Sequence, residues 1–451
     1  MNLLTLPWAE SCVLLPLAGA VGVRLLRDPA AAGRWTLAVS AAVFACSLLP
    51  WIALRAGLPG GRYFAVDALS APMLPLVALL HLLTVLATAR VKLNRMSLGG
   101  HLAAEGFRLG LFAAAPTAPW LLVLFLALGT LPPLVELRER NKPTRVYALH
   151  MGLFVGLLAA GWGLVEAGAV GLGSALLLLA VLVRSGTVPA HLWVADLFEH
   201  ATFGTALLFV TPLAGVYAAL RLVLPVAPDW VLTGLGAVSL ITALYAAGMA
   251  AVQDDARRFF AYLFLSHGSL VLVGLELHTS LSLTGAVCLW ASVALSLGGL
   301  GLVLRAVEAR HGRLSLAAFG GRYDQAPTLA VGFLLCGLGS VGFPGTLGFV
   351  AAELLVDGAT EANPLVGIGL TLASAVNGIA VLRAYLRLFT GRPSPTARPA
   401  AATLRERVAV LTLAALILGG GLVPQWGVAD RHDAVLAVVA ARDARAADGP
   451  P

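Results

Sequence analysis

The chain has 451 residues, of which 59% are hydrophobic and only 12% are charged, and its formal net charge is +7. A soluble globular chain has about 25% charged residues, so this composition excludes an ordinary soluble enzyme and predicts a membrane protein. In such a protein the surplus of basic residues marks cytoplasmic loops, and we expect no nucleic-acid partner.

Hydrophobic runs and helix breakers divide the chain into about fourteen candidate spans, most of them near the ~20 residues that a helix needs to cross a bilayer. The first segment has its basic residues after the apolar run, so we expect a retained helix and not a secretory signal peptide. The predicted fold class is an all-α polytopic membrane protein. In chain order the spans cover residues 11–26, 35–54, 68–89, 102–115, 119–137, 146–165, 168–188 with a continuation to 202, 204–225, 229–252, 258–276, 283–305, 328–356, 364–388 and 406–424.

Basic residues alternate between the predicted loops and indicate the orientation of the chain. The loops after spans one, three, five, nine, eleven and thirteen are basic, whereas most of the other loops carry few basic residues. By the positive-inside rule the basic loops face the cytoplasm and both termini lie outside it. We therefore expect a multi-pass protein of the bacterial inner membrane. One loop departs from the pattern, because the seventh carries Asp196 and Glu199 and no basic residue.

The sequence shows no pattern typical of a catalytic or metal site. Its four cysteines lie singly in apolar runs without metal-ligand spacing, and we interpret them as core residues. A phosphate-binding glycine loop and a nucleophile elbow are both absent from the sequence. We therefore expect no catalytic residue and no metal site in this chain.

Two spans combine a helix breaker with an ionisable residue. Arg184 precedes Pro189 in the seventh span, and Glu353 follows the sequence GFPG at 342–345 in the twelfth. A charge inside the bilayer is costly unless it has a partner, and broken helices often hold ions at the midplane of transporters. This arrangement predicts a functional or ion-pairing role for Arg184 and Glu353.

Several histidines lie within or beside the predicted spans. His267 lies deep in the tenth span after a basic loop, so its position leaves a functional role and a hydrogen-bonded packing role equally open. His81 and His150 are interpreted as hydrogen-bonded packing residues. The short amphipathic segment that follows the seventh-span proline adds His191 and Asp196 as auxiliary candidates.

Three sequence motifs resemble those of the antiporter-like subunits of respiratory complex I and of multi-subunit cation/proton antiporters. RSGTVPAHLWVADLFEHAT (184–202) is similar to K-x-x-x-V-P-x-H-x-W-L-P-D-A-H-x-x-A-P-T, and QDDARRFFAYLFLSH (253–267) to Q-T-D-x-K-R-x-x-A-Y-S-S-x-S-H. GSVGFPGTLGFVAAELL (339–355) is similar to S-L-G-L-P-G-x-x-x-F-x-x-E. The likeness covers roughly residues 60–390 in the family's order, and a glutamate at 353 resembles the M-type subunit.

The resemblance implies a fold in which spans seven and twelve are discontinuous helices related by an inverted repeat. It implies N-terminal transmembrane helices at 1–60, an antiporter-like proton-conducting membrane domain at 61–424 and a C-terminal tail at 425–451. The implied function is that of an M-like subunit of a complex I-type NADH-quinone oxidoreductase, which couples electron transfer to proton translocation. Other membrane subunits and the lipid bilayer would surround the chain, and partner subunits would bind NADH and quinone. The resemblance therefore implies a non-catalytic membrane subunit with no cofactor of its own, in which His267 is the central relay residue.

Several relay residues of the family are missing from this sequence. No ionisable residue occupies 127–129, where the fifth-span glutamate is expected, and Leu213 and Val293 stand in place of a lysine and a histidine. The seventh-span lysine is replaced by Arg184, which keeps its proton under protein conditions and is therefore a fixed cation. Glu136 is an auxiliary candidate for its counter-ion. We therefore predict that this copy conducts protons poorly or not at all.

Two other functions stay open from the sequence. The same module occurs in cation/proton antiporters, membrane-bound hydrogenases and inorganic-carbon uptake complexes, so the chain could belong to one of those assemblies. A stand-alone secondary transporter with a small-molecule site at the helix breaks is the second alternative.

Overall fold

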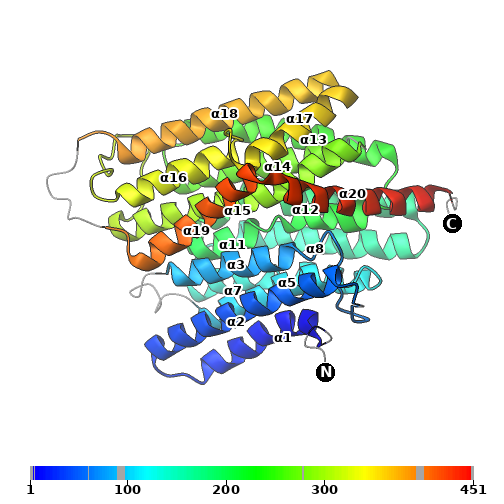
Figure 1. Ribbon diagram of the computed structural model, residues 1–451, viewed down its shortest axis with the longest axis horizontal. Coiled ribbons are helices and arrows are strands. Elements are labelled where there is room, and N and C mark those ends of the chain that lie inside the picture. The colour runs from blue at the N-terminus through cyan, green and yellow to red at the C-terminus, as the bar shows by residue number, and fades with distance from the viewer. Residues whose placement is uncertain are drawn as a thin grey trace.

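The computed structural model of the chain is a bundle of roughly parallel helices (Figure 1). It describes residues 4, 6–58, 60–88, 97–276, 279–392 and 401–447. Within these ranges the regular structure is helical, and the β-bridges Phe64–Ala114 and Asp255–Ser315 are isolated. The prediction of an all-α polytopic protein is confirmed. Residues 89–96 and 393–400, which belong to two predicted basic loops, lie outside the described residues.

The helices of the described residues follow the order of the predicted spans. They are α1 (Trp8–Arg24), α2 (Pro29–Arg55), α3 (Met73–Leu86), α5 (Leu98–Ala113), α6 (Pro119–Leu128), α7 (Leu131–Glu139), α8 (Arg145–Glu166), α9 (Val170–Ser185), α10 (Leu192–His200), α11 (Phe203–Val210), α12 (Ala214–Ala218) with a π-helical turn (Ala219–Val223), α13 (Asp229–Val252), α14 (Ala256–Glu276), α15 (Ser280–His311), α16 (Pro327–Ser340), α17 (Leu347–Ala362), α18 (Pro364–Phe389), α19 (Leu404–Leu422) and α20 (Pro424–Ala447).

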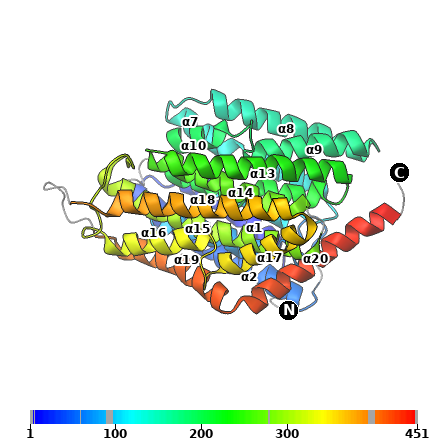
Figure 2. The same ribbon diagram turned by 90° about the horizontal axis from the view of Figure 1, so that it is seen from above.

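Eight helices among the described residues are long and apolar enough to cross a membrane, or nine if the pair α19 and α20, bent by 79°, counts as one span. Shorter apolar helices account for further predicted spans, among them α3, α9 and α16. Helix α15 lies at the centre of the bundle and is buried over most of its length. Figure 2 shows the other long helices packed around it.

Three spans are interrupted within the bundle. Residues 186–191 separate α9 from α10, and residues 341–346 separate α16 from α17. Glycine occupies the left-handed conformation at both interruptions, with φ +71° at Gly186 and +80° at Gly342, where a side chain would be strained. A third interruption, which the sequence did not predict, follows α11, where Pro212 lacks an N–H donor and Leu213 has φ +50°.

The C-terminal segment was predicted to be a tail, but most of it forms the 24-residue helix α20. Its apolar Ala434 and Val435 are buried, and α20 packs against α15. Its charged side chains reach neighbouring helices, which explains why a mixed-charge sequence is ordered here. The contacts are Asp430 with Arg55, His432 with Thr284, and Arg442 with Asp229.

Helices α8 and α9 pack closely because glycines face each other. A Cβ atom at Gly173 would lie 2.8 Å from the carbonyl oxygen of Gly161, whereas a Cβ at Gly171 would meet nothing within 4 Å. We expect Gly173→Ala to lower the stability by about 1–3 kcal/mol through overpacking, and Gly171→Ala to leave it unchanged or higher. Thermal unfolding of the purified chain in detergent measures both, and equal melting temperatures would contradict the close packing.

Asp67 precedes α3 and accepts hydrogen bonds from Arg221 Nη2 at 2.5 Å and from Ser70 N at 3.0 Å. Burial alone would raise the pKa of Asp67, but the hydrogen bond and charge of Arg221 and the hydrogen bonds from Ser70 outweigh burial and lower this pKa. A folded-state pKa below the unfolded value of about 3.9 stabilises the fold above that pH, and the stabilisation is lost as pH falls through the lowered pKa.

We therefore expect Asp67→Asn to lower the melting temperature at pH 7. The difference from the wild type should shrink as the pH falls below about 4, because the wild-type carboxylate then takes up a proton. Melting curves of both proteins over this pH range test the prediction. A difference that is independent of pH would show that the ionised carboxylate does not stabilise this loop.

Candidate functional site

A buried polar cluster joins α3 to α5. Glu105 and Arg108 lie one helical turn apart on α5, and His81 of α3 lies between their side chains. The Nε2 atom of His81 is 3.2 Å from Oε2 of Glu105, and its Nδ1 atom is 3.1 Å from Nη2 of Arg108. His81 and Glu105 are both 0% exposed. The imidazole therefore bridges a buried carboxylate and a guanidinium.

The chemistry of arginine fixes the tautomer of His81. A guanidinium can only donate hydrogen bonds, so Nδ1 of His81 accepts from Arg108 and a neutral ring carries its proton on Nε2. Nε2 of His81 lies 3.2 Å from Oε2 of Glu105, but the two atoms are not aligned as a hydrogen bond, and both lack a hydrogen-bond partner among the described residues. The cluster thus holds an imidazole and a carboxylate close together in a buried region, and a small rotation of either side chain would bring them into the hydrogen-bond geometry that proton transfer requires.

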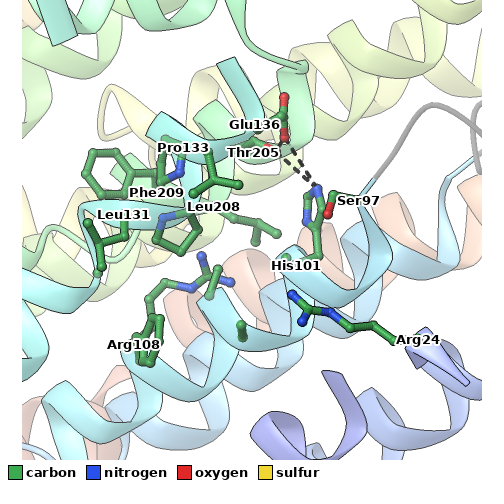
Figure 3. Close-up of a pocket in the computed structure, with 17 residues that line it drawn as sticks. Arg24, Ser97, His101, Arg108, Leu131, Pro133, Glu136, Thr205, Leu208 and Phe209 are labelled. Atoms are coloured by element: carbon green, nitrogen blue, oxygen red, sulfur yellow. Dashed lines mark hydrogen bonds and ion pairs between the residues drawn. The ribbon is translucent and has the colours of Figure 1, made fainter. Parts of the chain in front are cut away.

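A second polar chain continues from α5 to α7 and α11 (Figure 3). His101 lies on the same face of α5 as Glu105, and its Nε2 atom is 3.1 Å from Thr205 Oγ1. Thr205 donates its hydroxyl proton to Glu136, so the same oxygen can accept from His101. Glu136 also accepts from the backbone N of Thr202 at 2.7 Å. This carboxylate therefore both stabilises the start of α11 and ends a hydrogen-bonded chain.

A cavity of about 180 Å³ lies beside this chain (Figure 3). His101, Arg108 and Glu136 all line it. It extends to Arg24, the last residue of α1, and to Ser97, which precedes α5. The cavity therefore reaches from the buried cluster toward the end of the bundle at which α1 ends and α5 begins.

Arg184 lies in the last turn of α9, one residue before the helix ends at Ser185, and is 6% exposed. Its Nη2 atom donates to the carbonyl oxygen of Phe209 at 3.2 Å, and its guanidinium lies 4.0 Å from the centroid of the Phe209 ring. Among the described residues, no carboxylate lies within ion-pair distance of Arg184. A carbonyl and aromatic rings thus hold it in place as a fixed cation. A small cavity borders both Arg184 and Arg108.

The auxiliary candidates lie apart from Arg184. Glu136 pairs with Arg140 at 3.4 Å and does not reach Arg184. His191 begins α10, with its ring 5.3 Å from that of Tyr245, and Asp196 contacts His200 at 3.2 Å.

His267 on α14 is linked to the second interruption. Its Nε2 atom lies 2.9 Å from the carbonyl oxygen of Ser340, the last residue of α16, and its Nδ1 atom lies 2.8 Å from that of Leu263. Because carbonyl oxygens only accept, both bonds can form together only when the ring carries two protons. Glu353 lies on α17 beyond the interruption and is exposed on the surface of the chain. None of the hydrogen bonds or ion pairs of the described residues joins Arg184, His267 and Glu353 to one another.

Two buried apolar residues occupy the positions at which the resemblance places a lysine and a histidine. Leu213 is 6% exposed and Val293 is 0% exposed. The indole N–H of Trp290 donates a hydrogen bond to the carbonyl oxygen of Pro212. This carbonyl lies at the third interruption and so keeps a hydrogen-bond partner. Neither position offers a group that binds a proton.

The sequence analysis missed the polar face of α5. Its residues His101, Glu105 and Arg108 have the spacing i, i+4, i+7, which places them on one side of a helix. His81 was interpreted as a hydrogen-bonded packing residue, and its ring is buried and hydrogen-bonded to Arg108; the sequence did not indicate that Glu105 lies beside it. This spacing can be read from the sequence HLAAEGFR. The sequence does not show, however, that α3 packs on α5 and places His81 beside Glu105 and Arg108.

The interrupted, charge-bearing spans define the chain as an antiporter-like membrane subunit. It belongs to the family described as NADH:quinone oxidoreductase/Mrp antiporter, TM, which matches residues 150–377. Its relatives include NADH-quinone oxidoreductase subunit M of Rickettsia prowazekii, 26% identical over 54% of this chain and 52% of that protein. Subunit M of Mycobacterium tuberculosis is 27% identical over 55% of this chain and 46% of the relative. The chain thus spans about half the length of these curated relatives.

Solved structures share the fold over nearly the whole chain. A chain of respiratory complex I from Thermus thermophilus with bound NADH matches with a TM-score of 0.85 and 24% identity, over 96% of this chain and 99% of the other. A chain of the Mrp complex from Dietzia sp. DQ12-45-1b matches with a TM-score of 0.81 and 18% identity, over 96% and 98%. The helices α3, α5 and α7, which carry the buried cluster, precede the residues of the family match.

Proposed function

We propose that the chain is an M-like membrane subunit of a complex I-type NADH-quinone oxidoreductase and takes part in coupling electron transfer to proton translocation. The observation that carries this proposal is the pair of interrupted spans in a member of this family, with Arg184 in the last helical turn before the first interruption and Glu353 after the second. Other membrane subunits surround the chain, and partner subunits bind NADH and quinone.

The proposed topology has fourteen spans, with an inverted repeat that relates the two interrupted helices. Residues 1–60 form the N-terminal helices, 61–424 the antiporter-like domain and 425–451 the C-terminal segment. Both termini lie outside the cytoplasm, and the membrane is the bacterial inner membrane. In support, the connections after α1, α15 and α18 lie toward one end of the bundle, and both termini toward the other (Figure 1).

In the proposed mechanism, protons enter from the basic end and exchange with the cluster on α3 and α5. The cavity beside His101 and Glu136 leads toward Glu105, and the ring of His101 lies 6.4 Å from that of His81. Beyond the cluster, Leu213 and Val293 interrupt the path, so the proton returns to the side from which it came. The chain then contributes to coupling through the charge of Glu105, which changes near the fixed charges of Arg108 and Arg184. Proton conduction across the membrane through this copy is poor or absent.

A lysine at position 184 tests the fixed-cation role. We expect Arg184→Lys to lower the stability by about 1 kcal/mol, because an ammonium group loses the planar stacking on Phe209. It should also make the stability fall at alkaline pH, where a buried lysine loses its proton and an arginine does not. Melting temperatures across alkaline pH measure this, with the exposed Arg27→Lys as the control. A pH profile equal to that of the wild type would contradict the prediction.

A second candidate assembly is a multi-subunit cation/proton antiporter. The observation that favours it is the fold shared with a chain of the Mrp complex, which covers 98% of that chain. In that assembly the same charges would act without a redox partner.

Purification of the tagged chain in mild detergent, followed by mass spectrometry of the proteins that remain bound, tests the proposal. We expect subunits that oxidise NADH and reduce quinone to co-purify with the chain. Recovery of membrane antiporter subunits alone would favour the second candidate. Recovery of the chain alone, with melting raised by a small-molecule substrate, would support a stand-alone transporter and contradict both assemblies.

A further inference from the structure

A surface groove lies between the end of α2 and the start of α20, away from the buried cluster. One side of it is the face of α2 formed by Leu48, Trp51, Ile52 and Arg55, which have the spacing i, i+3, i+4, i+7. The start of α20 forms the other side, and the groove encloses about 420 Å³. Its opposing residues are Gly427, Asp430 and Arg431.

The groove is apolar along α2 and basic at its end. Arg55, the last residue of α2, forms an ion pair with Asp430, and its guanidinium lies 5.2 Å from the centroid of the Trp51 ring. Arg431 makes no ion pair within the part of the chain that the structure describes. Two guanidinium groups and one carboxylate leave a net charge of +1, so the groove is complementary to a single negative charge.

We propose that this groove binds one anionic phospholipid, with its phosphate at Arg431 and Arg55 and an acyl chain along Leu48 and Ile52. The groove lies at the last turns of α2, where a spanning helix meets the headgroup region. Tryptophan is enriched at this depth on both sides of a membrane, and arginine pairs with phosphate groups through charge-assisted hydrogen bonds. The bound lipid would hold α2 against α20, which belongs to the other end of the sequence.

The glycine at 427 gives the proposal a test that leaves every charge in place. A Cβ atom at Gly427 would meet nothing within 4 Å, so Gly427→Trp can fold and fill the groove. Arg431→Gln removes the free cation and keeps the Arg55–Asp430 pair. Gly419→Trp is the matched control, because Gly419 on α19 also has open space around it and does not line the groove.

The experiment uses the full-length chain, stripped of lipid in neutral detergent and mixed with dioleoylphosphatidylglycerol. Native mass spectrometry should show one retained lipid, and the melting temperature should rise. Arg431→Gln should weaken binding roughly tenfold, the effect of losing one charge-assisted contact. Gly427→Trp should abolish binding, and Gly419→Trp should bind like the wild type.

Three outcomes would overturn the proposal. Equal binding of zwitterionic dioleoylphosphatidylcholine would show that the arginines do not select a charge. An equal rise in melting temperature with inorganic phosphate alone would assign the site to a free anion. Unchanged lipid retention in the folded Gly427→Trp protein would show that the lipid binds elsewhere.

Discussion

Replacing Glu105 by glutamine is expected to destabilise the isolated chain by about 3–5 kcal/mol, because it removes one partner of a buried charge cluster. The side chain is fully buried against His81, and the substitution leaves the Arg108 guanidinium without its opposing charge. Thermal and chemical unfolding of the purified chain in detergent measure the loss. The same substitution at Glu353, which is exposed on α17, should have little effect on the isolated chain.

A double variant separates the loss of charge balance from the loss of packing. Glu105→Gln combined with Arg108→Met removes both charges, and we expect it to recover much of the stability that Glu105→Gln loses. Losses that simply add would contradict a coupled cluster. In that case Glu105 and Arg108 would act independently, and His81 would not bridge them.

Replacing Arg257 by methionine is the second substitution for which we expect a loss of about 3–5 kcal/mol. Arg257 forms a bidentate pair with Glu308 of α15, at 2.6 and 2.5 Å. It also donates to the carbonyl oxygens of Phe198 at 2.8 Å and Ala201 at 3.1 Å, where α10 ends. One guanidinium therefore caps the second half of the broken seventh span and anchors it to the central helix.

The neighbouring Arg258 is exposed and provides the control for Arg257. Arg258→Met should leave the melting temperature nearly unchanged. Hydrogen exchange in Arg257→Met should rise first in α10, because its terminal carbonyls lose their donor. Faster exchange in other helices of the bundle while α10 stays unaffected would contradict the capping role.

The helical fold and the breaks in the seventh and twelfth spans could be predicted because each depends on residues that are neighbours in the sequence. Apolar runs set the spans, and Pro189 and the GFPG sequence at 342–345 lie at two of the three interruptions described above. The third interruption was missed because its proline, Pro212, lies in an apolar run with no charged residue beside it. The helix α20 was underestimated because the partners of its charged residues, such as Arg55 and Asp229, are distant in sequence.

The candidate site was less predictable, because the contacts that form it join residues of different helices. Arg184 was identified as a buried cation from its position in a span, but its aromatic and carbonyl partners are on other elements. Glu105 lies in a short segment with weak hydrophobicity, and the family's pattern places the counter-ion in the fifth span, not on this segment. Only the packing of α3 on α5 brings His81, Glu105 and Arg108 together.

The central claim is that Glu105 exchanges protons with one side of the membrane and does not pass them across. The direct test is the number of protons translocated per electron by the assembly that co-purifies with the chain, reconstituted in vesicles and driven by its own electron donor. In the Glu105→Gln/Arg108→Met variant we expect slower turnover with an unchanged ratio of protons to electrons. A lower ratio at normal turnover would contradict the claim and show that this chain conducts protons.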